Sequence, residues 1–204
     1  MAATGSLIFN KGQYIMEKHS QMQAVVCHGP KDYRLERISK PLARPNELVI
    51  RIAACGICAS DCKCHSGAAM FWGGDNPWVK APVVPGHEVF GYVEQVGEGA
   101  EEHFEVKVGD KVIAEQIVLC GKCRFCKSGK YWMCEVHNIF GFQREVAEGG
   151  LAQYMRIPKT AIVHKIPESV SLEAYALIAP MACSIHTVNR GDGQLDAVLV
   201  IAGA

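Results

Sequence analysis

The sequence predicts a mainly β fold of the barrel or sandwich kind, with short helices towards its C-terminal end. Short segments rich in valine and isoleucine recur along the chain, and glycine, proline and aspartate separate them. Good helix formers gather from Ser171 onward. With 204 residues, of which 49% are hydrophobic, the chain is long enough to build a packed core.

The predicted domain begins near Met22, where apolar β-branched residues and a Gly-Pro turn indicate a strand and a hairpin. Residues 1–21 show no clear period, and we interpret them as a flexible N-terminal extension. Later segments of the same β-type composition are residues 47–57, 83–97, 106–118, 151–158 and 161–167. These segments supply the remaining strands of the barrel or sandwich.

The C-terminal part of the chain changes character. Residues 171–190 contain good helix formers, and Pro180 is expected to separate two helices because proline has no N–H for a helix interior. Residues 197–204 form an apolar run that ends in Gly-Ala and is typical of a buried parallel strand.

Composition and charge exclude several classes of partner. The 21 basic residues balance 21 acidic ones, so no broad attraction to nucleic acid or to an anionic membrane is expected. The sequence contains no apolar run of about 18 residues, the length that would indicate a membrane span. A small-molecule partner is therefore favoured. The chain does not open with a signal-peptide pattern, so we expect a cytoplasmic protein with reduced cysteines.

One group of thiols stands out by its spacing. Cys120, Cys123, Cys126 and Cys134 form the run C-x2-C-x2-C-x7-C. Four thiolates can complete a tetrahedral zinc shell. A shell filled by protein ligands leaves no position for substrate, so this run predicts a structural zinc site and places the chemistry elsewhere.

A second set of candidate ligands lies upstream. Ser60 lies two residues after Cys58, and His87 and Glu88 directly follow Gly86. A thiol, an imidazole and a carboxylate are ligand types of catalytic zinc, where three protein groups leave a position for water or substrate. Each signal is weak alone, but their order and spacing relative to the four-cysteine run make them specific.

These motifs resemble those of the zinc-dependent medium-chain alcohol and polyol dehydrogenases, of the sorbitol and threonine dehydrogenase kind. The shared features, in the family's order, are GICASD at 56–61, GHE at 86–88, VGDKV at 108–112, the four-cysteine lobe and a closing strand with glycine. The resemblance covers nearly the whole chain. It implies a GroES-like β-barrel catalytic domain at residues 22–190, a zinc lobe at 120–134, and the start of a truncated Rossmann domain at 191–204.

The resemblance also implies roles for the upstream residues. Cys58 and His87 would bind a catalytic zinc, and Glu88 would ligate the metal or lie just behind it. Ser60 would act as the catalytic hydroxyl that passes the alcohol proton away from the metal site, which a hydroxyl can do because it both donates and accepts. Asp61 is interpreted as a carboxylate that orients a ligand.

A third protein ligand is expected in the helical segment. Some family members supply a glutamate directly before a proline, but here Ala179 precedes Pro180. Other members have a cysteine three residues after that proline, and Cys183 fits that version. The competing interpretation of Cys183 is a small buried helix residue.

The exit of the proton relay is left open by the sequence. Many members have a histidine two residues after the aspartate, where this chain has Lys63, and His65 lies two residues further on. The remaining thiols upstream are interpreted as small buried residues outside the metal shell: Cys27, Cys55, Cys62 and Cys64.

The implied function is that of the catalytic domain of an oxidoreductase, which oxidises a secondary alcohol or polyol with zinc and NAD or NADP. Residues 185–187 resemble the polyol and threonine dehydrogenase branches more than the ethanol branch, which favours sugar alcohols or diols. Residues 68–80 either line the substrate cleft or pack within the barrel. The alternative function is a non-catalytic zinc-binding interaction module.

The cofactor half of that function is only partly represented. Gly203 resembles the first glycine of a Rossmann fingerprint, and it follows a suitable strand. We therefore expect a truncated form, inactive alone because most of the cofactor domain is missing. The full-length protein is expected to be a homo-oligomer.

Overall fold

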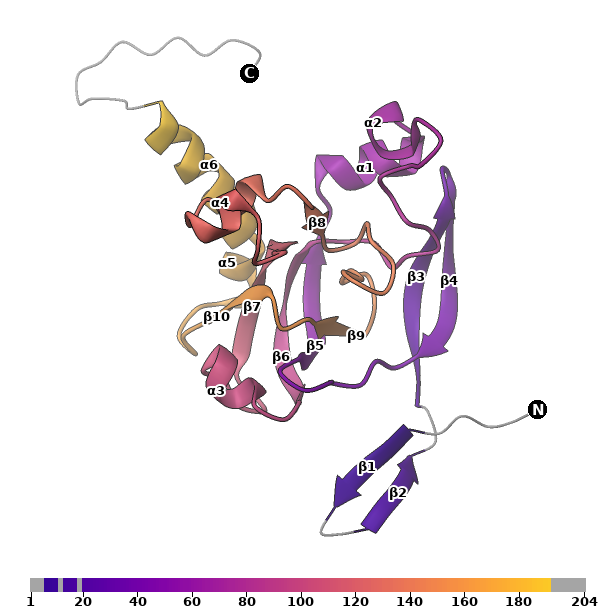
Figure 1. Ribbon diagram of the computed structural model, residues 1–204, viewed down its shortest axis with the longest axis vertical. Coiled ribbons are helices and arrows are strands. Elements are labelled where there is room, and N and C mark those ends of the chain that lie inside the picture. The colour runs from indigo at the N-terminus through magenta and orange to yellow at the C-terminus, as the bar shows by residue number, and fades with distance from the viewer. Residues whose placement is uncertain (1–5, 11–12, 18–19, 192–204) are drawn as a thin grey trace.

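A curled antiparallel sheet of six strands forms the centre of the fold, as the computed structural model in Figure 1 shows. The structure describes residues 6–10, 13–17 and 20–191. The strand order is β10-β7-β6-β5-β9, and β8 pairs with β7. The strands are β5 (Leu48–Gly56), β6 (Glu88–Val96), β7 (Lys111–Val118), β8 (Asn138–Ile139), β9 (Tyr154–Ile157) and β10 (Ala161–Lys165). The prediction of a mainly β fold is confirmed.

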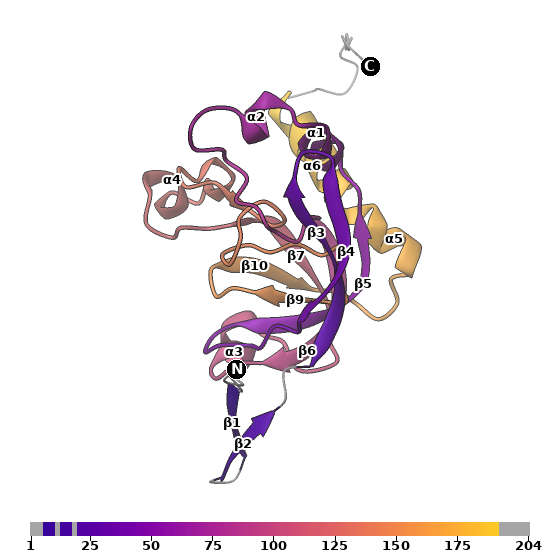
Figure 2. The same cartoon turned by 90° about the vertical axis from the view of Figure 1, so that its right-hand side faces the viewer.

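A long hairpin, β3 (Gln21–Gly29) and β4 (Asp32–Ser39), lies beside this sheet. The backbone N–H of Val25 donates to the carbonyl of Leu151 at 2.8 Å, and Cys27 exchanges backbone hydrogen bonds with Val83. These bonds join the hairpin to the loops that precede β6 and β9. Figure 2 shows how the hairpin and the curled sheet together enclose the interior.

The N-terminal segment holds a second hairpin, made of β1 (Ser6–Asn10) and β2 (Gln13–Glu17). Among the described residues its two strands form a sheet of their own. The sequence indicated no regular structure here, because a two-stranded hairpin buries too little apolar area to leave a strong pattern. The flexibility predicted for residues 1–21 stays a prediction.

The helices are short and lie around the sheet. They are α1 (Ala59–Ser66), α2 (Ala69–Trp72), α3 (Ala100–Phe104), α4 (Arg124–Lys127), a 3-10 turn (Tyr131–Met133), α5 (Leu172–Ala176) and α6 (Ile178–Arg190). Two helices were expected from Ser171 onward, and this is correct. The boundary is at Leu177, however, and Pro180 lies in the first turn of α6. A proline is tolerated there because the first-turn N–H groups have no partner within the helix.

The core is divided between two main clusters. The larger fills the curled sheet and contains fully buried side chains such as Leu48, Ile50 and Phe140. The smaller lies beneath α1 and α2 and contains Phe71 and Phe142. The first cluster fixes the sheet, and the second holds α1 against the loop that carries His87. None of the helices in the described part of the chain has the length and hydrophobicity that a membrane-spanning segment needs.

Candidate metal centres and substrate cleft

The first candidate centre is built at the start of α1. Cys58 is the N-cap residue, and its extended backbone turns the chain from β5 into the helix. The backbone N–H of Cys58 donates to Oδ2 of Asp61 at 2.9 Å, which satisfies one of the unpaired groups of the helix start. This local bond explains why the Cys-x-Ser-Asp segment holds its thiol and hydroxyl at a fixed helix end.

The second part of this centre is the loop before β6. Gly86 has a φ of 95°, a conformation that other residues rarely adopt, and it turns His87 towards α1. Backbone hydrogen bonds clamp this loop to a later segment, since Gly149 donates to Val84 at 2.7 Å and Gly150 donates to Gly86 at 3.0 Å. The clamp requires glycines, because a Cβ on Gly149 would overlap the carbonyls of Pro85 and Gly86.

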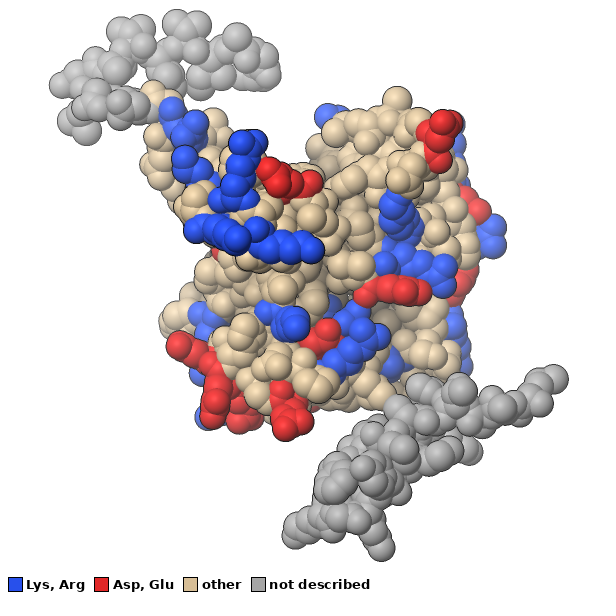
Figure 3. All heavy atoms as spheres, in the orientation of Figure 1, with Lys and Arg blue, Asp and Glu red and all other residues tan. Residues whose placement is uncertain are grey.

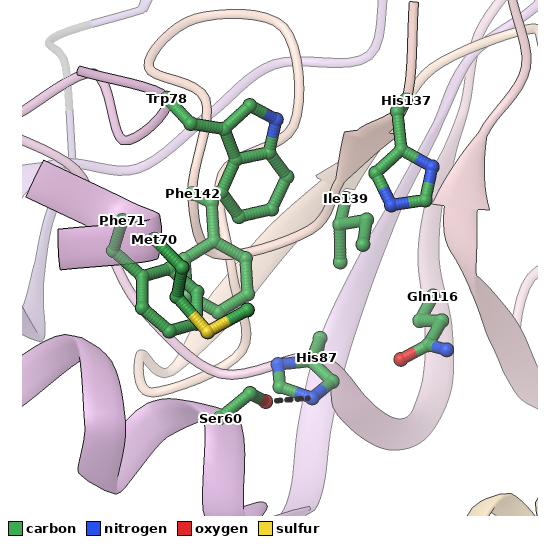
Figure 4. Close-up of a pocket in the computed structure, with 9 residues that line it drawn as sticks. All are labelled: Ser60, Met70, Phe71, Trp78, His87, Gln116, His137, Ile139 and Phe142. Carbon is green, nitrogen blue, oxygen red and sulfur yellow. Dashed lines mark hydrogen bonds between the residues drawn. The ribbon is translucent and has the colours of Figure 1, made fainter. Parts of the chain in front are cut away.

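These two elements bring three predicted ligands together. The ligand atoms of Cys58, His87 and Glu88 lie within 4.8 Å of one another. The Ser60 hydroxyl lies 3.2 Å from His87 Nε2, as Figure 4 shows. On the other side of the ring, His87 Nδ1 faces Asp61 Oδ1 at 3.5 Å. His87 Nδ1 and Asp61 Oδ1 are both buried and have no hydrogen-bond partner among the described residues.

The electrostatics of the centre favour metal ligation. Burial raises the pKa of the Cys58 thiol, but hydrogen bonds with Ser60 and His87 outweigh burial and place the pKa below its ordinary value. Burial lowers the pKa of His87, but Asp61 and Cys58 together raise it by more than burial lowers it, so the net shift is upward. A dication would compensate these thiolate and carboxylate groups. The donor set of sulfur, nitrogen and oxygen therefore fits zinc.

Cys183, predicted as a further ligand, lies outside this group. Its side chain is exposed on α6, a helix in which no residue is buried. The prediction that it binds the metal stays a prediction, and the competing interpretation of a buried helix residue does not fit its exposure. Gly203 lies outside the described residues.

The four predicted lobe cysteines form the second centre. Their sulfur atoms lie within 4.8 Å of one another, and Cys120 Sγ is 3.9 Å from Cys126 Sγ. A tetrahedral site with Zn–S bonds of about 2.3 Å needs sulfur separations of about 3.8 Å. The backbone N–H of Cys126 donates to Cys123 Sγ at 3.4 Å, and this bond is the main cause that lowers the pKa of Cys123 to about 6. The lobe therefore fits a closed zinc shell.

The lobe is tied to the sheet by a hydrogen bond from the Tyr131 hydroxyl to Glu115 at 3.1 Å. Its exposed surface is basic, and Figure 3 shows blue side chains gathered around α4, with acidic and basic groups intermingled over the rest of that face. The basic side chains of the lobe are Lys122, Arg124, Lys127 and Lys130.

A cleft of about 360 Å³ opens beside the first centre. Its apolar lining consists of Met70, Phe71, Trp78, Ile139 and Phe142. Its polar lining consists of Ser60, His87, Gln116 and His137. Figure 4 shows these side chains converging on the space above Ser60 and His87.

Residues 68–80 contribute both to the cleft and to packing. Met70, Phe71 and Trp78 line the cleft, while Trp72 donates its indole N–H to the carbonyl of Cys64 at 2.7 Å. The two alternatives left open by the sequence are thus both realised. Sequence reasoning missed Gln116 and His137, although a glutamine inside the apolar strand IAEQIV was a signal for a side chain facing a polar space.

The other predicted positions divide into buried and exposed side chains. Cys27 and Cys64 are buried as expected, but Cys62 is exposed, so its interpretation as a buried thiol is wrong. Cys62 faces outward because α1 buries the opposite side of the helix, which carries Asp61 and Cys64. Lys63 and His65 are both exposed on α1.

Comparison with known proteins assigns the family. The alcohol dehydrogenase GroES-like domain matches residues 44–168, and the chain belongs to this family. The family resemblance and the GroES-like fold class are therefore confirmed.

Individual relatives agree with this assignment. The erythritol/L-threitol dehydrogenase of Mycolicibacterium smegmatis is 45% identical over 90% of this chain and 51% of its own length. The chain spans about half the length of the curated relatives it matches. The structure of 2R,3R-butanediol dehydrogenase from Bacillus subtilis has a TM-score of 0.70 at 33% identity, over 82% of this chain and 47% of that one.

A candidate zinc-binding dehydrogenase from Sinorhizobium meliloti, bound to NADP, has a TM-score of 0.70 at 26% identity, over 84% of this chain and 46% of that one. The reported relatives are thus named as dehydrogenases, two of them after small polyols or diols.

Proposed function

We propose that this chain is the catalytic domain of a zinc-dependent oxidoreductase that oxidises a small polyol or another secondary alcohol with NAD or NADP. The observation that carries the proposal is the three-ligand group of Cys58, His87 and Glu88, whose His87 side chain lines a cleft. A group with three protein ligands beside a cavity suits a catalytic metal, whereas the four-cysteine lobe suits a structural one.

Each residue of the centre has a defined task. Cys58, His87 and Glu88 would hold zinc, which as a Lewis acid lowers the proton affinity of an alcohol oxygen. The Ser60 hydroxyl lies beside His87 Nε2 and can take the alcohol proton while donating its own. Asp61 faces the opposite ring nitrogen and orients the imidazole. The aromatic side of the cleft offers an apolar surface to the carbon chain of the alcohol.

NAD or NADP, the acceptor of the hydride, is proposed as a cofactor of the whole protein and not of these 204 residues alone. No complete G-x-G-x-x-G fingerprint occurs in the 204 residues, and Gly203 would be its first glycine. We infer that the chain alone binds an alcohol at its metal but does not reduce NAD. The related structure from Sinorhizobium meliloti is bound to NADP.

Metal analysis and ligand binding test the proposal together. The purified chain should contain two zinc ions, and erythritol should bind only when the Cys58 centre is loaded. Cys58→Ser should remove one zinc and abolish erythritol binding, while the exposed Cys62→Ser control should change neither. A single zinc, retained by Cys58→Ser, would instead support the non-catalytic zinc-binding module. NADH formation by the chain alone would contradict the inferred inactivity.

A further inference from the structure

The cleft beside the first metal centre has two chemically different sides. Met70, Phe71, Trp78 and Phe142 form an aromatic and thioether side. In Figure 4, Gln116 and His137 lie across the cleft from Met70 and Phe71, and the metal-binding His87 lies below them. A purely apolar cleft would suit a simple alcohol, so the polar side calls for a different ligand.

Gln116 is an exposed polar side chain on β7, a strand whose other side chains are buried or half-buried. Its neighbours Ile117 and Val118 on β7 are only 8% and 2% exposed, whereas Gln116 is exposed to the cleft. Among the described residues, no hydrogen-bond partner is present for its carboxamide, which therefore has both donor and acceptor capacity to offer a ligand.

His137 is held in place from two directions. Its backbone has a φ of 53°, a left-handed conformation that histidine adopts more readily than most residues. It lies three residues after Cys134, the last cysteine of the lobe, so the lobe leads directly into this position. Its ring packs against Trp78 at a centroid distance of 6.0 Å. The imidazole thus has a fixed place on the cleft wall and can donate and accept.

We propose that Gln116 and His137 form a hydroxyl-recognition wall that hydrogen-bonds the hydroxyl groups of a small vicinal polyol next to the hydroxyl that reacts. This inference rests on the proposed function and adds its specificity determinants. A polyol presents a donor and an acceptor on each successive carbon, which matches the two side chains, while its C–H groups pack against Trp78 and Phe142.

The size of the cleft agrees with this ligand. A volume of about 360 Å³ is near the lower end of ligand sites, which span about 300–1,000 Å³. The cleft therefore suits a polyol of a few carbons. A site built to bond a hydroxyl discriminates against an analogue that lacks it, because the protein groups are then left without partners.

Binding measurements on the zinc-loaded chain test the wall without relying on turnover. The probes are erythritol and 2-butanol, which have the same number of carbons but different numbers of hydroxyls, and their affinities are measured by ligand-observed NMR. Gln116→Leu and His137→Gly should each weaken erythritol binding about three- to tenfold and leave 2-butanol binding nearly unchanged. His137→Asn, which tolerates the left-handed backbone and can still donate and accept, should retain most of the erythritol affinity. Gln21→Leu, at an exposed glutamine on β3, should have no effect.

The outcomes distinguish this inference from the proposed function. If wild type binds erythritol in a zinc-dependent way and the wall variants bind it equally well, the wall is refuted and the proposed function stands. If wild type binds neither alcohol when loaded with zinc, both are refuted. Equal losses for erythritol and 2-butanol in the variants would also refute the wall, because they would indicate a general loss of cleft shape. Zinc content and circular dichroism of each variant confirm that the comparison is between folded, loaded proteins.

Discussion

Asp61 Oδ1 faces His87 Nδ1 at 3.5 Å, and the other carboxylate oxygen of Asp61 accepts the backbone N–H of Cys58 at 2.9 Å. One buried carboxylate therefore positions two predicted metal ligands that are 29 residues apart in the sequence. The first distance is slightly longer than a hydrogen bond. Metal at Nε2 would leave the proton on Nδ1, where the carboxylate can accept it.

Asp61→Asn should weaken metal binding at the first centre about 10- to 100-fold, because the amide keeps the shape but loses the charge that orients His87. Competition of the chain with a chromophoric zinc chelator measures this affinity. Asp75→Asn, at an exposed aspartate of the α2–β6 connection, is the matched control. Equal affinities for the two variants would show that Asp61 serves only the helix start.

Metal affinity at this centre should fall as the pH is lowered through the range in which Cys58 and His87 take up protons. Metal binding needs the Cys58 thiolate and the neutral His87 ring, so it releases protons. Although burial lowers the pKa of His87, Asp61 and Cys58 together raise it more, and protons therefore compete with metal at a higher pH than for an ordinary histidine. In Asp61→Asn the loss should move to lower pH. Cobalt titrations at several pH values check the shift, and an unchanged midpoint would contradict the role of the carboxylate.

Gly149→Ala should destabilise the fold by about 1–3 kcal/mol and reduce zinc at the first centre. A methyl group there would overlap the backbone carbonyls of Pro85 and Gly86, directly before His87. Gly29→Ala is the control, because a Cβ at Gly29 would meet nothing within 4 Å, and its effect should stay within about 0.5 kcal/mol. Urea denaturation and zinc analysis report the two effects. Similar results for both glycines would mean that the clamp is not tight.

Cys126→Ser should remove the zinc of the lobe and increase amide exchange in residues 120–134. Among the described lobe residues, buried side chains are limited to Cys134, so the metal supplies most of the local stability. Binding of erythritol should weaken as well, because His137 follows Cys134 by three residues and a loosened lobe would displace it from the cleft. Hydrogen exchange measured by mass spectrometry checks the local effect. Unchanged protection in the zinc-free lobe would show that the lobe folds without metal.

Much of the fold and most of the candidate metal-binding side chains could be predicted from the sequence. Strands β5, β6, β7, β9 and β10 fall within the predicted segments, because period and turn residues are local signals. The four-cysteine lobe was predictable for the same reason, since its ligands lie within one short run. The exception is Pro180, where a proline in a first helix turn resembles a helix break in the sequence.

Tertiary structure alone decided which distant groups meet. It joined Cys58 to His87 and Glu88, left Cys183 exposed on α6, and placed Gln116 opposite Phe71 across the cleft. Residue spacing fixes contacts within a helix or a turn, but a site between β7, α1 and a loop depends on how the sheet curls and on which glycines admit a close backbone. The sequence by itself thus determined the ligand types and the family, and the packing of the sheet against α1 decided the shape and polarity of the cleft.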